Sequence, residues 1–577
     1  MSLSRREFLQ MLAMAGVAGT GLGGRHNAHA AAPTNLYEVP PFGNVSLLHF
    51  TDCHAQLIPT YFREPNINIG VGGSRGKAPH LVGEALLRHF KIAPYSIEAH
   101  AFTNLNFEEM ARQYGKVGGF AHLATLVKRL RASRPGRTLL LDGGDTWQGS
   151  ATALWTNGQD MVDACKLLGV DMMTAHWEFT YGDTRVKEIV DRHLKGRIEF
   201  LAQNVFDTSF GEERVFKPYV IREVNKVKVA VIGQAFPYTP IANNRFAFPN
   251  WSFGIRDEEM QKQVDECRKK GAQVVILLSH NGMDVDLKMA SRVRGIDAIL
   301  GGHTHDAMPA PSIVSNAGGK TLVINSGSNT KFLSVLDLDV RGGRVADFRF
   351  KMLPIFSNLL PADKPMADYI TKVRAPYKQK LEEKLAVSES LLYRRGNFNG
   401  TFDQMIVDAL IEVQDAEIAL SPGFRWGTTL LPGDAITVEH VMDQTAITYG
   451  AATINELSGA DIKVILEDIA DNLYNPDPYY QQGGDMVRVG GLKYSLDLNA
   501  LHGKRISDME VRGRKVDADK TYKVAGWASV QPQPNGKKQI WDIMTEYLRS
   551  KKTVRVGQPY VPKLKGKDAT NNPGLSV

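Results

Sequence analysis

The chain has 577 residues, 43% of them hydrophobic and 23% charged, and because a hydrophobic core stops growing at about 250 to 300 residues, two domains are expected. After the N-terminal region no apolar run is long enough to span a bilayer, which excludes an integral membrane protein for the body of the chain. The formal net charge is +7, and Arg5, Arg6, Arg25 and Glu7 contribute +2 of it, which leaves 7 − 2 = +5 for the rest of the chain. This excess suits an anionic substrate, an acidic partner or solubility alone. Nucleic-acid binding would need denser runs of Lys and Arg.

The first thirty residues have the pattern of an export signal. Arg5 and Arg6 precede an apolar stretch rich in Ala and Gly, and the letters AHA before Ala31 supply the small residues of a cleavage site. This pattern is typical of a twin-arginine signal peptide, here residues 1–30, with an uncleaved tether as the alternative. Because twin-arginine substrates cross the membrane already folded, we expect a periplasmic protein that receives its metal before export.

Short apolar runs recur from Val45 onward and alternate with amphipathic stretches. Each run is rich in Val, Ile and Leu and ends in Gly, Ser, His or Asp, which is typical of buried strands with polar residues at their carboxyl ends. Those ends are where α/β folds bind ligands, so residues 31–355 are predicted to form an α/β catalytic domain. The runs are VSLLHF, TLLLDGGD, KVAVIGQAF, QVVILLSHNG, DAILGGHTH and TLVINSG.

The character of the sequence changes after this region. The segment KMLPIFSNLLPADKP is punctuated by Pro and precedes a charged amphipathic stretch, which predicts a linker helix within residues 356–389. A second α/β domain is expected over residues 390–565, and the tail, residues 566–577, is expected to be disordered. The prediction is therefore a two-domain α/β protein.

Seven residues of the types that bind metal ions follow the predicted strands. One buried His is often only a hydrogen-bonded core residue, but a whole set at the ends of one predicted sheet is hard to explain in that way. In the D-x-H and H-x-H pairs, the side chains of residues i and i+2 project to the same side, so both can bind one metal ion. A carboxylate can bridge two ions, and mixed imidazole and carboxylate ligands suit Mn, Zn, Fe or Ni and two-metal activation of water for an in-line displacement. The seven residues are Asp52, His54, Asp145, His176, His280, His303 and His305.

The cysteines suggest no disulfide framework. Only Cys53, Cys165 and Cys267 occur, an odd number for an oxidising compartment. Cys53 lies between two candidate ligands, and neighbouring residues of an extended chain point to opposite faces. A packed thiol is therefore a better interpretation of Cys53 than a reactive one.

The order of the motifs resembles that of a known family. The calcineurin-like metallophosphoesterases have five motifs in the same order as this chain. These motifs are D-x-H, G-D-x-x-x-G, G-N-H-E (here replaced by another segment), a lone His after a strand, and G-H-x-H. The two-domain layout is similar to the 5′-nucleotidase branch of that family over nearly the whole mature chain. The resemblance implies a metallophosphoesterase αββα sandwich followed by a 5′-nucleotidase-like C-terminal α/β domain. It implies one metal held by Asp52, His54, Asp145 and His305, and a second held by Asp145, His280, His303 and the residue at the Asn position of G-N-H-E.

The sequence departs from the nucleotidases at three places. AHWEFTYG puts His176 where the family has its Asn ligand and Trp177 where it has its catalytic His. LSPGFRWG retains Arg425, and GGDMVRVGGL puts Asp485 where an aromatic residue would stack on a nucleobase. The site therefore lacks one of the aromatic residues that would stack on a nucleobase.

These departures, together with FTDCHAQL and RRGNFNGTFDQMI, resemble one family, the SoxB thiosulfohydrolases of periplasmic sulfur oxidation. The resemblance implies a dinuclear metal-dependent hydrolase with two Mn²⁺, although Zn or another divalent metal fits the same ligand types. It implies an S-sulfosulfanyl-L-cysteine sulfohydrolase, which releases sulfate from a cysteine S-thiosulfonate on the C-terminal arm of the SoxYZ carrier. We expect a monomer with no nucleic-acid partner and no membrane contact in the mature form.

Roles for individual residues follow from this interpretation. A metal-bridging hydroxide is the expected nucleophile, with Asp145 as the bridging ligand. Arg425 is the expected anchor of the sulfonate, because a guanidinium forks onto two oxyanion oxygens, and Arg394 or Arg395 either assists it or is a surface charge. Trp177 is expected to form an apolar wall, with simple packing as the alternative, and Asp485 is expected to line the substrate site.

Two other functions remain open at this point. A 5′-nucleotidase or cyclic-nucleotide phosphodiesterase would need to bind its base in another way. A non-catalytic exported metal-binding scaffold would explain the missing catalytic His at the position of Trp177.

Overall fold

The computed structural model describes residues 36–531 and 536–576, so the predicted signal peptide lies outside the described residues. Among the helices that are described, none combines the length and the apolar character that crossing a membrane requires.

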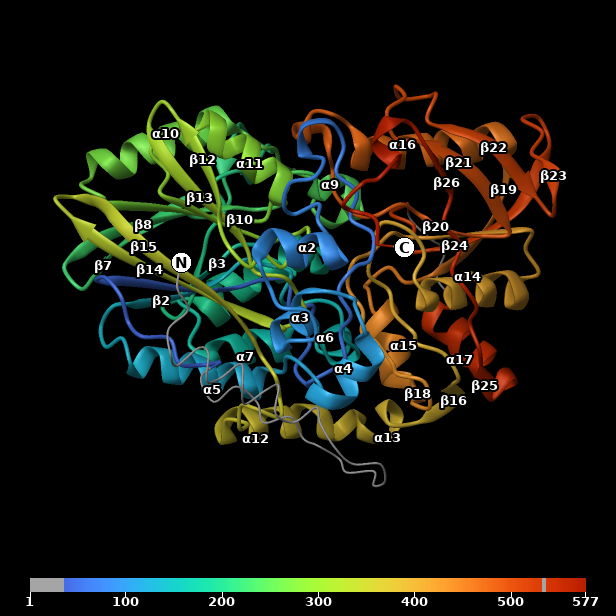
Figure 1. Ribbon diagram of the computed structural model, residues 1–577, viewed down its shortest axis with the longest axis horizontal. Helices are drawn as coiled ribbons and strands as arrows, with labels where there is room; N and C mark the ends of the chain where they lie inside the picture. The colour runs from blue at the N-terminus through green and yellow to red at the C-terminus, as the bar shows by residue number, and fades with distance from the viewer. Residues whose placement is uncertain (1–35, 532–535, 577) are drawn as a thin grey trace, which may run out of the picture. The chain divides into compact units, whose positions relative to one another are not determined.

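Two six-stranded sheets form the N-terminal part of the described chain (Figure 1). All six apolar runs of the sequence are strands of these sheets, so this part of the prediction is confirmed. The first sheet has the order β15 (Arg344–Pro354), β14 (Phe332–Arg341), β1 (Val45–Phe50), β2 (Thr138–Asp142), β3 (Met172–Met173) and β4 (Glu199–Phe200). The second has the order β12 (Ser312–Asn316), β13 (Gly319–Asn325), β11 (Ala298–Gly301), β10 (Val274–Ser279), β8 (Val227–Gln234) and β7 (Tyr219–Val224).

The two sheets pack face to face, and helices cover their outer faces. Leu47 and Leu139 of the first sheet share a buried apolar cluster with Val231 and Ile276 of the second. The helices α5 (Phe120–Ala132) and α7 (Gln159–Leu168) lie on one side of the strands, and α10 (Asp257–Lys269) and α11 (Met283–Arg292) lie on the other (Figure 1). The central strands, such as β10, are buried along their whole length because both of their faces are covered. The predicted αββα sandwich is confirmed.

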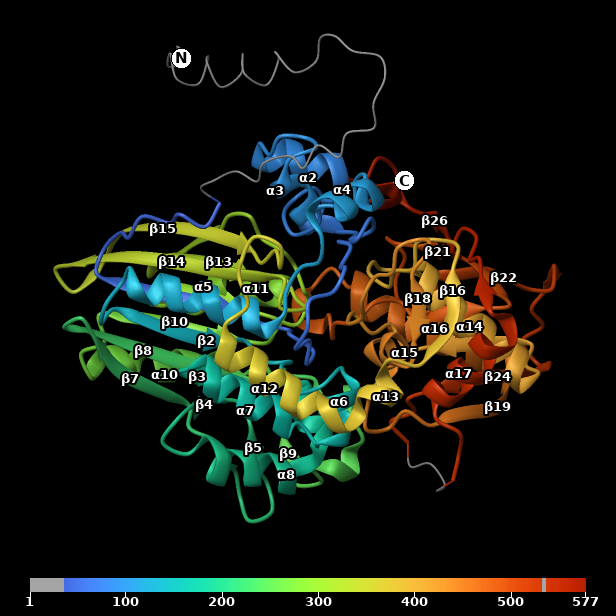
Figure 2. The ribbon, with the colours of Figure 1, turned by 90° about the horizontal axis from the view of Figure 1, so that it is seen from below.

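The chain leaves this sandwich through α12 (Lys364–Arg374) and α13 (Lys378–Leu381), which Figure 2 shows leading into the C-terminal elements. Asp363 caps α12 by accepting a hydrogen bond from the Met366 amide, and Met366 and Ile370 anchor the helix in the core of the sandwich. A helix therefore stands within the predicted linker.

The C-terminal part is a second α/β region. Its central sheet has the order β19 (Ala452–Ser458), β24 (Thr521–Trp527), β17 (Ile418–Ser421) and β20 (Arg488–Gly490). The helix α14 (Thr401–Gln414) contacts β17 and β20, and α16 (Gly459–Tyr474) contacts β19.

The prediction that the tail is disordered is wrong for its described residues. The backbone amide of Asn68 donates to the carbonyl of Gly574 at 2.8 Å, and Leu575 forms a β-bridge with Ile67. The side chain of Asn572 donates to the carbonyl of Gly70 at 3.0 Å. A polar tail without apolar periodicity can thus be held by backbone pairing to a distant loop, which a sequence pattern does not reveal.

Candidate metal centre

The seven predicted ligands converge where the strands of the two sheets end. Asp52, Asp145 and His176 follow β1, β2 and β3 of the first sheet, and the other histidines of the second group follow β10 and β11 of the second sheet. The ligands form two buried groups, and within each group one ligand atom per residue lies within 4.8 Å of the others. One group is Asp52, His54, Asp145 and His305, and the other is Asp145, His176, His280 and His303. This ligand chemistry fits two divalent metal ions that share one carboxylate.

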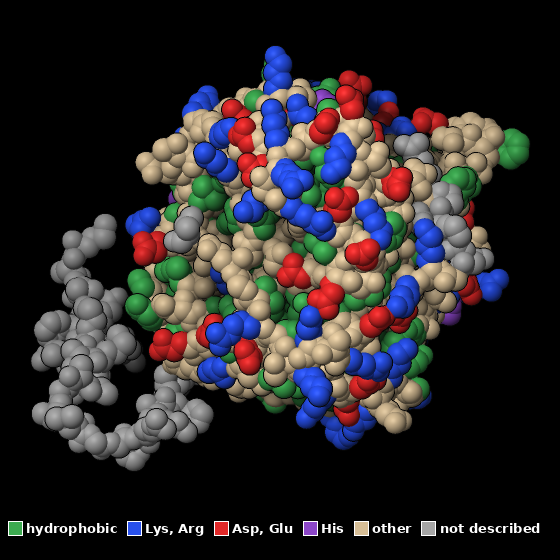
Figure 3. All heavy atoms as spheres, turned by 90° about the vertical axis from the view of Figure 1, so that its right-hand side faces the viewer, with side chains coloured by type: hydrophobic (Ala, Val, Ile, Leu, Met, Phe, Trp, Pro, Cys, Tyr) green, Lys and Arg blue, Asp and Glu red, His purple; other side chains and the backbone are tan. Residues whose placement is uncertain are grey.

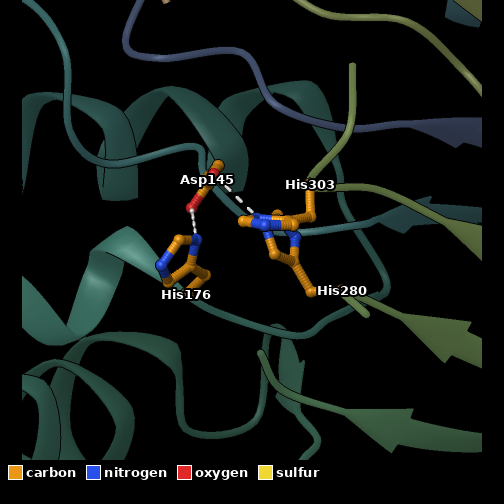
Figure 4. A group of neighbouring side chains, drawn as sticks. All are labelled: Asp145, His176, His280 and His303. Atoms are coloured by element: carbon orange, nitrogen blue, oxygen red, sulfur yellow. Dashed lines mark ion pairs between the residues drawn. The ribbon is translucent and has the colours of Figure 1, made fainter. Parts of the chain in front are cut away.

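Asp145 belongs to both groups, and Figure 4 shows it with the three histidines of the second group. Its Oδ2 lies 3.1 Å from His280 Nε2 and 3.7 Å from His54 Nε2, so the same oxygen faces one histidine of each group. Its Oδ1 lies 3.3 Å from His176 Nδ1 and accepts a hydrogen bond of 2.7 Å from the Trp177 amide. The backbone of the altered loop therefore fixes the orientation of the shared carboxylate.

The backbone is strained at the ligands themselves. Asp52, His54, Asp145, His303 and His305 all have positive φ angles, between 46° and 73°. Residues other than glycine seldom adopt this conformation, which persists only where the surrounding structure enforces it, and such residues cluster at functional sites.

Outer contacts orient individual ligands. The Nδ1 of His280 lies 2.6 Å from the carbonyl of Gly143, which leaves Nε2 directed at the two carboxylates. The hydroxyl of Thr51 donates to Asp52 Oδ2 at 2.6 Å.

Burial and charge set the protonation states of the histidines. Burial lowers the pKa of His54 to about 4, and it lowers the pKa of His176, His303 and His305 below the ordinary value. These four rings are therefore neutral, the form that binds a metal. Burial also acts to lower the pKa of His280, but Asp145 and Asp52 outweigh it and raise that pKa to about 10. A metal ion bound beside His280 has to displace a proton.

Glu178, which follows Trp177, ties the two ligand loops together. Its buried Oε2 accepts hydrogen bonds from the amides of His176 (2.9 Å) and Asp145 (3.2 Å). Its Oε1 accepts from the amides of Thr146 (2.6 Å) and Trp147 (3.2 Å). One carboxylate thus satisfies four backbone donors from the loops after β2 and β3.

We expect Glu178→Gln to destabilise the protein by about 3 kcal/mol, because the new amide group faces backbone donors and cannot accept from them. Denaturant unfolding and metal analysis measure the two consequences, lower stability and reduced metal content. Glu188→Gln is a matched control, since Glu188 is a half-exposed partner of Arg185, and this change should leave stability almost unaltered. Equal stability of the two variants would contradict this role for Glu178.

A cavity of about 260 Å³ opens beside Asp145, His176 and His303. Aromatic side chains form much of its wall, and three of them were not among the predicted site residues: Phe236, Phe424 and Trp426. The ring of Phe236 stacks on His303 with centroids 4.0 Å apart. Phe424 and Trp426 stack on each other at 4.0 Å, and Trp177 meets both edge-on at 5.4 and 5.3 Å. The alternation in the letters FRW, with Arg425 between two aromatics, is a sequence signal that could have indicated this wall.

The structure separates the three predicted substrate-binding arginines. Arg425 lines the cavity, where its Nε donates to Asp485 at 3.2 Å and its Nη2 to the carbonyl of Gly484 at 2.5 Å. Arg395 lines an adjoining cavity instead. Arg394 lines neither of these two cavities, and its guanidinium donates to Asp403 and to the carbonyls of Gln444 and Pro422.

Asp485 lies in the cavity wall and holds charged neighbours in place. Its carboxylate accepts hydrogen bonds from Arg425 Nε, Arg488 Nη2 (2.9 Å) and Asn397 Nδ2 (3.2 Å). Burial acts to raise the pKa of Asp485, but Arg425 and Arg488 outweigh it and lower that pKa. The ionised Asp485 thereby orients Arg425.

Cys53 is fully buried, and burial raises the pKa of its thiol well above the ordinary value. A buried thiol of high pKa is inert, which fits the interpretation of Cys53 as a packed residue.

Comparisons with known proteins agree with this geometry. A family model of the 5′-nucleotidase C-terminal domain matches residues 385–537. The 5′-nucleotidase of Bos taurus is 25% identical over 497 residues, which cover 78% of this chain and 83% of the relative. A 5′-nucleotidase precursor of Thermus thermophilus has a TM-score of 0.71 at 22% identity, covering 90% of this chain and 99% of that chain, a likeness of fold alone.

A second solved structure is much more similar. The sulfate thiohydrolase SoxB of Thermus thermophilus, in complex with glycerol, has a TM-score of 0.87 and is 38% identical, with 92% of this chain and 98% of that chain covered. The likeness spans the sandwich with its two ligand groups and the C-terminal region with the aromatic cavity. The chain therefore belongs to the SoxB family, within the 5′-nucleotidase branch of the calcineurin-like metallophosphoesterases.

Proposed function

We propose that this protein is a thiosulfohydrolase that removes the terminal sulfonate from a cysteine S-thiosulfonate on the SoxYZ carrier and releases sulfate. The observation that carries the proposal is the place of Trp177 in the wall of the cavity beside the second ligand group, packed against Phe424 and Trp426. An apolar wall suits a slender sulfur-bearing arm. Two divalent cations, which we propose to be Mn²⁺, would supply an activated water and stabilise the negative charge of the sulfonate.

The charges behind the cavity favour an anionic substrate. Four guanidinium groups and two carboxylates lie there in one connected cluster, so their sum is 4 − 2 = +2. Arg425 pairs with Asp485 through Nε, but its Nη1 has no hydrogen-bond partner among the described residues. A sulfonate oxygen would supply that partner. The cluster consists of Arg394, Arg395, Arg425, Arg488, Asp403 and Asp485.

The leaving group accounts for the absence of a catalytic His at position 177. A nucleotidase expels an alkoxide from a phosphate with about two negative charges, and a cationic donor helps with that charge. A terminal sulfonate carries one charge, and a persulfide leaving group has a low pKa, so it departs without being protonated. Trp177 cannot supply a proton, and for this substrate none is needed.

The test is sulfate release from carrier protein loaded with a cysteine S-thiosulfonate, with manganese-reconstituted enzyme and a nucleoside monophosphate measured in parallel. Sulfate release without nucleotide turnover is the expected result. Phosphate release alone would favour a 5′-nucleotidase or cyclic-nucleotide phosphodiesterase, which the matched C-terminal domain also fits. Full metal content with no turnover of any substrate would favour a non-catalytic metal-binding scaffold.

Trp177→His tests whether this residue sets specificity. The imidazole would restore a cationic donor beside Asp145, so we expect phosphomonoesterase activity to rise by about 10²-fold while thiosulfonate hydrolysis changes by less than about tenfold. Initial rates with both substrates give the ratio. Trp155→His is a control, because Trp155 packs against Tyr377 and Lys380 away from the cavity. Unchanged rates toward both substrates in Trp177→His would argue for a mere packing role.

We also propose export to the periplasm by the twin-arginine pathway and a monomeric state. The paired arginines of the N-terminal segment support the export route. On the face of the C-terminal region that Figure 3 shows, basic and acidic side chains are interspersed rather than separated by sign, an arrangement that offers little to a nucleic acid.

A further inference from the structure

A second cavity, of about 50 Å³, adjoins the main one. His303, Arg425, Gly483 and Gly484 line both cavities and form the wall between them. The remaining lining comes mostly from polar side chains, including Asn281, Thr304 and Arg395, and we call this space the arginine chamber. It has room for roughly four water molecules, which is comparable to the five heavy atoms of a tetrahedral oxyanion.

The wall between the cavities is thin because it contains two glycines. Gly483 and Gly484 have φ angles of +80° and +79°, which residues with side chains seldom adopt. A Cβ atom on Gly483 would lie 1.9 Å from His303 Nε2, so the bare backbone lies directly against a ligand histidine of the second group. The arginine chamber therefore begins at the metal centre itself.

The chamber wall carries cationic donors that lack acceptors. Arg395 is 5% exposed, and its Nη2 donates to the carbonyls of Thr304 (3.1 Å) and His305 (3.2 Å). Within the part of the chain that the structure describes, neither its buried Nε nor Arg425 Nη1 has a hydrogen-bond partner. Leaving a charged donor unsatisfied in the interior is costly, and an anion is the ligand that removes this cost.

The two acidic residues that line the chamber have partners of their own. Asp284 forms a 2.7 Å ion pair with His80. Asp306 accepts a hydrogen bond of 3.1 Å from Asn68. Neither carboxylate accepts a hydrogen bond from Arg395 Nε or Arg425 Nη1, so these two donors face the chamber without an acceptor among the described residues.

We propose that the arginine chamber is a second oxyanion site, which receives sulfate from the metal centre before the product leaves the protein. The identity of the anion rests on the proposed function. If the substrate is an arm that fills the main cavity, the sulfate formed at its tip cannot return past it. A sulfate held in the chamber, which His303 and Arg425 line together with the main cavity, has left the reacting centre while the arm is still seated.

Selenate is the probe for this site, because it is a tetrahedral oxyanion with an anomalous X-ray signal. Crystals of the metal-loaded protein soaked in selenate are expected to give two selenium peaks, one at the metals and one against Arg395 in the chamber. In Arg395→Gln the chamber peak is expected to vanish while the peak at the metals remains. A single peak at the metals of the unaltered protein, or a chamber peak that persists in Arg395→Gln, would overturn the proposal.

Sulfate binding in solution gives an independent readout. In titration calorimetry of the metal-loaded protein, we expect Arg395→Gln to weaken the chamber site by roughly tenfold or more. Arg88→Gln is the matched control, since Arg88 is exposed and pairs only with Glu84. Leu473→Trp, which adds bulk to the chamber lining without changing charge, is expected to remove the same binding event. Unchanged sulfate binding in both chamber variants would refute the site.

These measurements separate this inference from the proposed function. Selenate and sulfate binding do not require turnover, so a chamber occupied by anion would stand even if the carrier were not a substrate. Conversely, sulfate release from the carrier by a protein with one anion site would support the proposed function and eliminate the chamber.

Discussion

Asp145→Asn is expected to leave the protein with less than one metal ion per chain and to reduce hydrolysis by about 10³-fold or more. Asp145 is the one residue common to both ligand groups, and its Oδ2 faces His280 and His54 together. An asparagine keeps the volume but replaces one carboxylate oxygen by an amide NH₂, which cannot bind a cation. Metal analysis and the rate of sulfate release measure the two effects.

Asp142→Asn is the matched control for that experiment. Asp142 is the last residue of β2, three positions before Asp145, and is equally buried, but it is in neither ligand group. Burial, with a contribution from Glu178, raises its pKa to about 8, so the side chain is largely protonated at neutral pH and an amide resembles it. Asp142→Asn should therefore keep both metals. Full metal content in Asp145→Asn would contradict the shared-ligand arrangement.

Arg425→Lys is expected to lower kcat/KM for the thiosulfonate by about 10²-fold without loss of metal. Lysine retains the positive charge but lacks the planar fork that Asp485 and the carbonyl of Gly484 hold in place. Because Arg425 belongs to neither ligand group, metal analysis should give the same content as in the unaltered protein.

The comparison with Arg425→Ala distinguishes charge from geometry. If fork geometry dominates, the Lys and Ala variants should be similarly impaired. If charge alone matters, Arg425→Lys should stay close to the unaltered enzyme, and this outcome would remove the anchoring role. Asp485→Asn should give a smaller loss than Arg425→Lys, since it loosens the position of Arg425 but leaves the guanidinium in the cavity.

Most of the metal ligands could be predicted from the sequence because they follow runs of buried apolar residues. The expected single sheet is wrong, since Asp52 follows a strand of the first sheet and His280 a strand of the second, but the carboxyl ends of strands from both sheets meet at the ligand groups. The position of Trp177 was expected from the resemblance of AHWEFTYG to the G-N-H-E motif. The local sequence pattern was sufficient to predict a ligand's position wherever a strand end determined that position.

The residues that line the substrate side of the cavity could not all be predicted from the sequence. Arg394 and Arg395 are neighbours in sequence, yet one bonds Asp403 and the other lines the arginine chamber. The path of the loop decides the direction of each of these two side chains, and the hydrophobic periodicity of the sequence does not predict that path. Phe236 reaches the wall from another strand end altogether, so its contact with His303 exists only after folding.

The docked tail has a consequence for the order in which the protein can be assembled. Residues 572–576 hydrogen-bond the loop of residues 66–82, and that loop supplies Asn68, Pro79 and His80 to the wall of the arginine chamber. Asn572 lies 502 residues after Gly70 in the chain, so this wall is complete only when two very distant segments have come together. A chain truncated before residue 572 could still assemble both ligand groups, but its chamber would lack the contacts that hold one side in place.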